Sequence, residues 1–273
     1  MYYHSSSQIG LRDKNEDELD AIINLNNENT SLNKINFFGV YDGHGGPHIS
    51  NYLKANLSKF FLDKSIEESP SNTKCYNRYI IKIYDYIQKQ LIANSKSAKL
   101  SGSTALVAIR YLKNDKDKLK IINLGDCRAV LCNENNIGVP LTRDHKPMSY
   151  VENHRIIKIN GVITQNINDD PRINGLSVSR AFGDLDATPH VSHIPEIFDY
   201  DLNGAKFLIM ACDGVWDVLS NQDAVDFVLY TLDKIKVNSN CTIKSNRNIA
   251  YLLGEYAINK GSQDNISVLI HFL

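Results

Sequence analysis

A short run of the sequence, Phe38 to Gly46, places a carboxylate, an imidazole and three glycines directly after an apolar segment. Asp42 could ligate a metal ion, and His44 could supply a proton beside it. The glycines would let the backbone and a ligand approach closely. An Asp-Gly pair is also a common turn signal. The run therefore indicates either a metal site that handles phosphate or a tight turn.

Further acidic residues lie at the edges of other predicted strands. They are Glu16, Asp17, Asp213 and Asp264. Antiparallel strands could gather these side chains at one end of a core. Clustered carboxylates repel each other unless they are protonated or bridged by cations, and oxygen-only ligand sets select hard ions such as Mg²⁺ or Mn²⁺. Two ions would suit this number of carboxylates. The alternative is that Asp42-Gly and Asp213-Gly only end two strands.

Hydrophobic periodicity predicts the elements that must position these residues. We predict strands at Ala21–Leu25, Ile35–Tyr41, Thr104–Tyr111, Leu119–Leu124, Arg128–Cys132, Lys206–Ala211 and Ile266–Phe272. We predict helices at His48–Leu62, Tyr76–Ala93, Met148–Ile159, Asp223–Ile235 and Arg247–Asn259, and loops at Asp63–Lys74, Asn94–Ser101 and Val237–Asn246. Short turns between strands favour antiparallel pairing. The pattern predicts one α+β domain over residues 1–273, with helices covering a mainly antiparallel core.

The composition narrows the classes of partner. The chain has 273 residues, of which 42% are hydrophobic and 22% charged, and its formal net charge is -1. Nothing in this balance favours binding to nucleic acid or to an anionic membrane. No signal peptide or membrane-spanning run is evident, so we expect a cytoplasmic or nuclear protein. Five cysteines without a Cys-x-x-Cys pair indicate reduced thiols, and we expect a monomer.

Nine segments in register give the chain a family resemblance from about Gly10 to its C-terminus. They read RDKNED, FGVYDGHGG, SGSTA, NLGDCRAVL, LTRDHKP, ENHRI, RINGLSVSRAFGD, ACDGVWDVLS and SQDNISVLI. With them the chain resembles the metal-dependent type 2C protein serine/threonine phosphatases, the PPM family. The resemblance implies a four-layer αββα sandwich, in which two antiparallel β-sheets are flanked by helices, with a two-metal site at one end.

The resemblance also assigns ligands for the two ions, which would be Mg²⁺ or Mn²⁺. The residue matching Asp42 bridges both metals, and the carbonyl matching Gly43 completes one coordination sphere. Asp213 and Asp264 match the ligands of the other metal. Glu16 matches a carboxylate that serves the first metal directly or through water.

Other matched positions imply the rest of the mechanism. Asp17 would support Glu16, and Asp144 matches the ligand of a third, weaker metal in some members. Arg12 would bind the phosphate, for which a planar fork of donors is suited, and His44 would be the general acid. Water would attack phosphorus in line without a covalent enzyme intermediate, and the substrates would be phosphorylated proteins. The stretch of about 162–196 corresponds to a variable flap beside the site.

The sequence also suggests three rival interpretations. Asp13, Asn15 and Asp17 have the spacing of a calcium-binding EF-hand loop, but the glycine and glutamate that such a loop needs further on are absent. Cys241 and Arg247 have the Cys-x₅-Arg spacing of cysteine-dependent phosphatases, without a glycine between them to shape a phosphate cradle. The third is a catalytically inactive scaffold or sensor, although such proteins usually lose the metal carboxylates.

Overall fold

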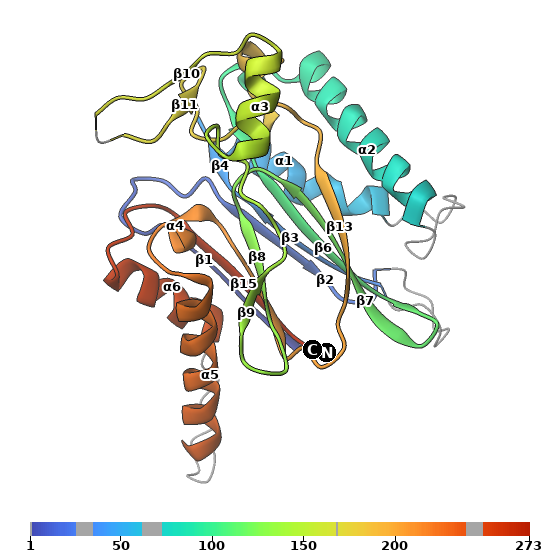
Figure 1. Cartoon of the computed structure of the whole chain (residues 1–273), viewed down its shortest axis with the longest axis vertical. Helices are drawn as coiled ribbons and strands as arrows, with labels where there is room; N and C mark the ends of the chain where they lie inside the picture. Colours follow the sequence, from blue (N-terminus) through green and yellow to red (C-terminus); the bar gives the residue numbers. More distant parts are fainter. Residues whose placement is uncertain (1, 26–34, 62–72, 168, 239–247) are drawn as a thin grey trace.

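Two five-stranded antiparallel sheets, packed face to face, form the centre of the molecule (Figure 1). The computed structural model describes residues 2–25, 35–61, 73–167, 169–238 and 248–273. The first sheet has the strand order β1-β15-β14-β8-β9, and the second has the order β13-β7-β6-β3-β2. Each of these neighbouring pairs is antiparallel.

The strands of the two sheets have the following bounds. The first sheet contains β1 (Tyr2–Gln8), β15 (Ile266–Phe272), β14 (Phe207–Ala211), β8 (Arg128–Cys132) and β9 (Gly138–Pro140). The second sheet contains β13 (Glu196–Asp201), β7 (Lys116–Leu124), β6 (Ala105–Lys113), β3 (Asn36–Tyr41) and β2 (Glu18–Ile22). Residues alternate between the two faces of a strand. In β3, Phe38 and Val40 therefore point to the opposite sheet, whereas Phe37 and Tyr41 point to the helices.

Helices cover the outer face of each sheet. The second sheet packs against α1 (His48–Asn56), a 3-10 helix over Leu57–Phe61 and α2 (Thr73–Asn94). The first sheet packs against α4 (Asp213–Trp216), α5 (Asn221–Asn238) and α6 (Ile249–Asn259). A third apolar cluster fills the space between the sheets. These layers confirm the αββα sandwich.

Smaller elements lie at the end of the sandwich where β3 and β14 finish. A three-stranded sheet has the order β12 (Phe182–Gly183), β5 (Gly102–Ser103) and β4 (Gly43–His44). The flap carries the pair β10 (Ile163–Thr164) and β11 (Arg172–Ile173), and it packs against α3 (Tyr150–Lys158). Figure 1 shows β10, β11 and α3 together above the ends of the main strands.

The seven predicted strands are all present, five of them with shifted ends. The strand predicted at Ala21–Leu25 is observed at Glu18–Ile22, whereas those at Arg128–Cys132 and Ile266–Phe272 match their predictions. Strands β1, β9 and β13 of the main sheets were not predicted. β1 has the polar sequence YYHSSSQ, which gives no apolar pattern. It lies at the edge of its sheet and pairs only with β15, and an edge strand can be polar.

The five predicted helices are present as well, but one of them and the three predicted loops differ in detail. The loop predicted at Asn94–Ser101 includes the last residue of α2 and a 3-10 helix over Ser97–Lys99. The helix predicted over His48–Leu62 is α-helical only to Asn56 and continues as a 3-10 helix. The loop predicted at Asp63–Lys74 is wrong at its end, because α2 already begins at Thr73; the rest of it lies outside the described residues. Of the loop predicted at Val237–Asn246, the first two residues belong to α5 and the others lie outside the described part. Within the described residues, no helix is long and apolar enough to cross a membrane.

Candidate metal centre and catalytic cavity

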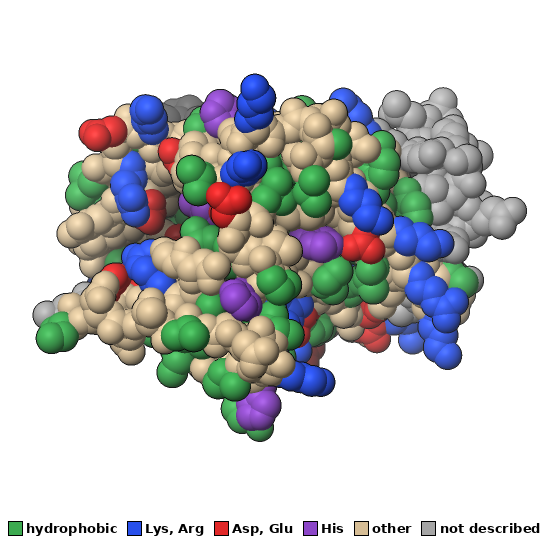
Figure 2. All heavy atoms as spheres, turned by 90° about the horizontal axis from the view of Figure 1, so that it is seen from above, with side chains coloured by type: hydrophobic (Ala, Val, Ile, Leu, Met, Phe, Trp, Pro, Cys, Tyr) green, Lys and Arg blue, Asp and Glu red, His purple; other side chains and the backbone are tan. Residues whose placement is uncertain are grey.

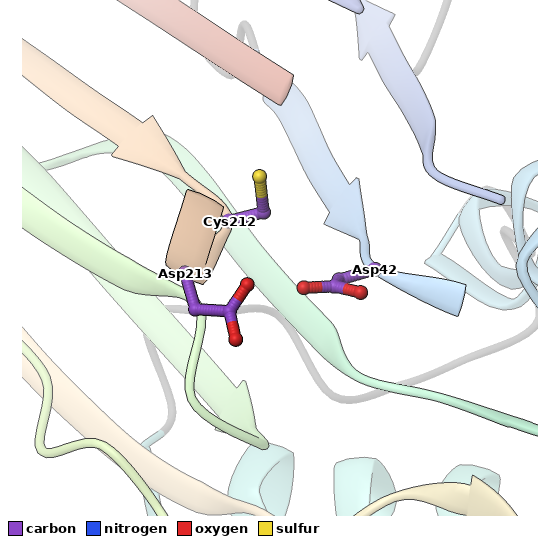
Figure 3. A group of neighbouring side chains, drawn as sticks. All are labelled: Asp42, Cys212 and Asp213. Carbon is purple, nitrogen blue, oxygen red and sulfur yellow. The ribbon is translucent and has the colours of Figure 1, made fainter. Parts of the chain in front are cut away.

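Two aspartates from different sheets meet at the end of the sandwich. Asp42 follows β3 of the second sheet, and Asp213 begins α4 directly after β14 of the first sheet. Carboxylate oxygens of Asp42 and Asp213 and the Sγ of Cys212 lie within 4.8 Å of one another. Figure 3 shows the two carboxylates pointing toward each other. The antiparallel sheets thus bring together residues that are 171 positions apart in the chain.

Backbone contacts fix the position of both aspartates. The Asp42 amide donates to the hydroxyl of Thr104 at 3.0 Å, and the Asp42 carbonyl accepts from the Thr104 amide at 2.9 Å. The amide of Cys212, just before Asp213, donates to the carbonyl of Ser267 at 3.1 Å. Each carboxylate therefore projects from a backbone that a neighbouring strand holds in place.

Asp17 lies buried behind this pair. Its side chain is near the start of β2, and its Oδ2 has no hydrogen-bond partner. Burial, together with the charges of Asp213 and Asp264, raises the pKa of Asp17 to about 7, although Ser267 and Cys212 oppose the rise. When no cation is near, burial and the neighbouring negative charges therefore favour the protonated, neutral form of Asp17.

A fourth aspartate, Asp126, belongs to the same cluster, and it was not predicted from the sequence. It is 1% exposed, and neither of its carboxylate oxygens has a hydrogen-bond partner. Burial and the charge of Asp213 raise its pKa well above the ordinary range, while Lys146 opposes the rise. A signal was present in the sequence, since Gly125-Asp126 follows a predicted strand just as Asp42 and Asp213 do.

The electrostatics of the cluster suit divalent cations. Burial and the neighbouring charges of Asp17 and Asp213 raise the pKa of Asp42, and burial and Asp217 raise that of Asp213 to about 6. Carboxylates that lack water and repel one another are stabilised by a cation. Oxygen donors of this kind fit Mg²⁺ or Mn²⁺. The residues present therefore fit the metal ions that the resemblance implies.

Glu16 and Gly43 line the cavity together with Asp42, and they lie close to each other. The Glu16 side chain accepts a hydrogen bond from the Gly46 amide at 2.9 Å, and its carbonyl accepts from the Ser50 hydroxyl at 2.5 Å. A Cβ on Gly43 would lie 2.3 Å from that same Glu16 carbonyl oxygen. Only glycine lets the segment after Asp42 pass so close to Glu16.

A cavity of about 560 Å³ opens over the carboxylates. Figure 2 looks down on this end of the molecule and shows Lys and Arg side chains interspersed with Asp and Glu. The cavity is lined by Arg12, Asp13, Lys14, Glu16, Asp42, Gly43, His44, Gly45, Thr104, Asp126, Arg172, Leu176, Ser177, Val178, Asp213, Asp264 and Asn265. Apart from Asp17 and Asp144, every predicted site residue is among them.

Two arginines reach the cavity from different elements. Arg12 donates to the carboxylate of Asp264 at 2.7 Å and to the carbonyl of Gln263 at 3.2 Å. Arg172 lies on β11 of the flap and pairs with Asp169 at 3.2 Å. Arg12 was predicted from its motif, but Arg172 was not, because an arginine in a variable segment gives no signal by itself. Both guanidinium groups could bind the oxygens of a phosphate.

His44 lies at the edge of the cavity and contacts an acidic residue of the flap region. Its Nε2 is 2.7 Å from the Oδ2 of Asp184, a side chain that is 2% exposed. The two residues are 140 positions apart. His44 was predicted from its motif, whereas its contact with Asp184 has no local signal in the sequence.

The structure does not bring Asp144 into the cavity. Both of its carboxylate oxygens accept hydrogen bonds from Arg128, at 2.6 and 3.0 Å. The neighbouring Lys146 reaches the cluster instead, with its Nζ 3.6 Å from Asp126 and 3.3 Å from Asp217. Asp126 is thus among the residues that line the cavity, whereas Asp144 is not.

Two cysteines and the tryptophan near the cavity are buried in the core. Cys127 and Cys212 are buried, and burial raises the pKa of both thiols. Trp216 is buried in the apolar cluster under α4 and donates from its ring nitrogen to the carbonyl of Ala211 at 2.9 Å. Cys241 and Arg247 lie outside the described residues.

Comparison with known proteins agrees with this geometry. Residues 2–266 match the Protein phosphatase 2C family. A PP2C-like domain-containing protein of Acanthamoeba polyphaga mimivirus is 43% identical over 176 residues, which cover 59% of this chain and 97% of that protein. Protein phosphatase 1L of Bos taurus is 30% identical over 270 residues, covering 96% of this chain and 69% of that protein.

A solved structure shows the same fold. The serine-threonine phosphatase 2C from Toxoplasma gondii superposes with a TM-score of 0.79 at 23% sequence identity. The superposition covers 99% of this chain and 94% of that one.

Proposed function

The chain belongs to the protein phosphatase 2C family of serine/threonine phosphatases, and on that premise we propose how its cavity hydrolyses phosphoserine and phosphothreonine in proteins. Two Mg²⁺ or Mn²⁺ ions would be held by the carboxylates at the end of the sandwich. The observation that carries this proposal is the cluster of mutually repelling aspartates, in which Asp17 and Asp126 are buried and Asp42 and Asp213 are half-buried. Without cations, repulsion between these carboxylates destabilises the folded protein, and their side chains add no apolar packing that would offset it.

The candidate ligands can be assigned to the two ions. Asp42, which follows β3 and faces Asp213, would serve both ions. Asp213 and Asp264 would serve one ion, and Glu16 with the Gly43 carbonyl would serve the other. We propose Asp126 rather than Asp144 for a third, weaker ion, because Asp126 lines the cavity whereas Arg128 holds Asp144.

When bound, the ions would activate a water molecule as the nucleophile and offset the charge of the phosphate. Arg12 would bind phosphate oxygens, for which its guanidinium must turn from Asp264 toward the substrate. Thr104 would keep Asp42 in place during the reaction. His44 would donate a proton to the leaving oxygen of serine or threonine. No covalent intermediate is needed, since water would attack phosphorus in line.

Nothing favours the inactive scaffold as a second function. The cavity is lined by Asp42, Asp213 and Asp264 together with Arg12 and His44. A scaffold would have no need to keep these groups around a cavity large enough for a phosphorylated side chain.

The test is hydrolysis of a phosphothreonine peptide by purified protein with Mn²⁺ or Mg²⁺, with and without a chelator. The variants are Asp42→Ala, Asp213→Ala and Cys241→Ser. We expect turnover that the chelator abolishes, that both aspartate variants lose and that Cys241→Ser retains. Turnover that resists the chelator and requires Cys241 would contradict the proposal. So would folded, metal-loaded protein with no activity on any phosphopeptide.

A further inference from the structure

The contact between His44 and Asp184 has a precise structural origin. Strand β4 contains His44 and pairs with β5, which in turn pairs with β12, and Asp184 directly follows β12. This three-stranded sheet lies apart from the two main sheets. Its effect is to bring the residue after β12 next to the second residue of β4, so that the imidazole and the carboxylate meet at 2.7 Å.

Asp184 is held from several directions. Its amide donates to the carbonyl of Ser101 at 3.1 Å. The preceding residue, Gly183, forms two hydrogen bonds with the buried side chain of Gln88 on α2. The Gln88 amide group donates to the Gly183 carbonyl at 2.9 Å, and its oxygen accepts from the Gly183 amide at 3.0 Å. Asp184 itself has φ 47°, a left-handed conformation in which aspartate and asparagine are favoured over most other residues. These contacts leave the carboxylate little freedom to move.

Gly102 shapes the space in which the two side chains meet. A Cβ at this position would lie 2.1 Å from the Asp184 Oδ2 and 2.5 Å from the His44 Nε2. A side chain here would therefore force the imidazole and the carboxylate apart. The contact depends on a glycine in the middle strand of the small sheet.

We propose that Asp184 is a positioning residue for His44. A carboxylate accepts hydrogen bonds, so the imidazole donates from Nε2 and carries that proton toward Asp184. Nδ1 has no hydrogen-bond partner among the described residues. In the imidazolium form, Nδ1 therefore carries the second proton and donates it to the leaving oxygen, which leaves the ring as the tautomer protonated on Nε2. A carboxylate that orients an imidazole in this way fixes both the ring and its tautomer. The inference rests on the proposed role of His44 as general acid.

A purely structural ion pair would behave differently in a kinetic experiment. Loss of a structural contact lowers activity on every substrate by a similar factor. Loss of a contact that positions a general acid lowers activity chiefly on substrates whose leaving group must be protonated. Phosphothreonine has such a leaving group, whereas p-nitrophenolate departs as a stable anion.

The kinetic experiment therefore compares a phosphothreonine peptide with p-nitrophenyl phosphate in the Mn²⁺-loaded protein. Its variants are Asp184→Asn, His44→Asn and the double variant. Asparagine tolerates the left-handed conformation, so Asp184→Asn leaves the backbone in place. The matched control is Asp186→Asn, an exposed residue in the adjoining 3-10 helix over Leu185–Ala187.

We expect Asp184→Asn to lower kcat on the phosphopeptide by about tenfold or more, and kcat on p-nitrophenyl phosphate by less than about threefold. In the His44→Asn background, Asp184→Asn should have no further effect, because it acts through the missing imidazole. Equal losses on both substrates, or multiplicative losses in the double variant, would overturn the inference.

A second measurement does not depend on activity. ¹⁵N NMR of the His44 ring in wild-type protein, at a fixed mildly alkaline pH, reports which nitrogen carries the proton. We expect Nε2 in wild type and a mixture of tautomers in both Asp184→Asn and Gly102→Ala. A wild-type ring protonated on Nδ1 would overturn the inference even if the enzyme is active. A wild-type protein that folds and binds Mn²⁺ but hydrolyses neither substrate would instead overturn the proposed function, and with it this role for Asp184.

Discussion

Asp17→Asn should make the metal-free protein more stable while weakening its function. Asp17 is buried beside Asp213 and Asp264, and its Oδ2 has no partner. Its pKa in the folded protein is about 7, against an ordinary value of 3.8. A group whose pKa is raised by folding stabilises the protein fully below its unfolded pKa, and this contribution is lost as the pH rises through the folded pKa. For Asp17 the loss falls between about pH 4 and 7.

The size of the effect follows from that difference. At about 1.4 kcal/mol for each pH unit, holding Asp17 ionised in the metal-free fold costs about 4 kcal/mol above pH 7. Asparagine cannot ionise, but its amide meets the hydrogen bonds of Ser267 and Cys212 less well, which offsets about 1–3 kcal/mol. We therefore expect Asp17→Asn to raise the free energy of unfolding by about 2 kcal/mol at pH 8, and by much less at pH 5.

The assay is urea unfolding in the presence of chelator, from pH 5 to 8, for wild type, Asp17→Asn and the control Asp115→Asn. Asp115 is exposed in the turn between β6 and β7 and has φ 59°, which asparagine accommodates. Burial lowers the pKa of His271 to about 4, which makes the stability of every variant rise with pH over part of this range. The difference between variant and wild type removes that shared contribution. A difference that stays constant or shrinks as the pH rises would refute the reasoning.

Three further predictions concern the core, the flap and the cavity. Ile209→Ala, in the fully buried strand β14, should lower the free energy of unfolding by about 2–5 kcal/mol in a urea titration. Glu152→Gln should cost about 3 kcal/mol in the same titration, because the buried Glu152 pairs with both Arg180 and Arg155; an unchanged midpoint would contradict this. Arg172→Ala should raise KM for a phosphopeptide about fivefold and change kcat by less than about twofold in steady-state kinetics, and a loss confined to kcat would contradict its assignment to substrate binding.

The layers of the fold could be predicted because the core strands have strong apolar patterns. β3, β8 and β15 lie almost where the periodicity placed them. Edge strands were harder, because a strand that pairs on one side only can be polar. β1 has three consecutive serines, and β13 carries acidic residues at exposed positions, so neither has a clear strand pattern.

Site residues could be predicted only where they belong to a short motif that is continuous in the sequence. Asp42 and Asp213 were found because each is followed by glycine at the end of an apolar strand. Asp126 has glycine before it instead, and it was overlooked for that reason. Asp184 could not have been found from the sequence, because its relation to His44 depends on a small sheet that joins three separate segments.

The proposed phosphatase mechanism requires that the aspartate cluster binds divalent cations. Equilibrium dialysis of folded, chelator-treated protein against Mn²⁺ tests it most directly, with Asp42→Asn compared with wild type and with Asp115→Asn. We predict about two Mn²⁺ ions per wild-type and control chain, and about one or none in Asp42→Asn. A folded wild-type protein that binds no Mn²⁺, or an Asp42→Asn variant that binds as many ions as wild type, would contradict the account.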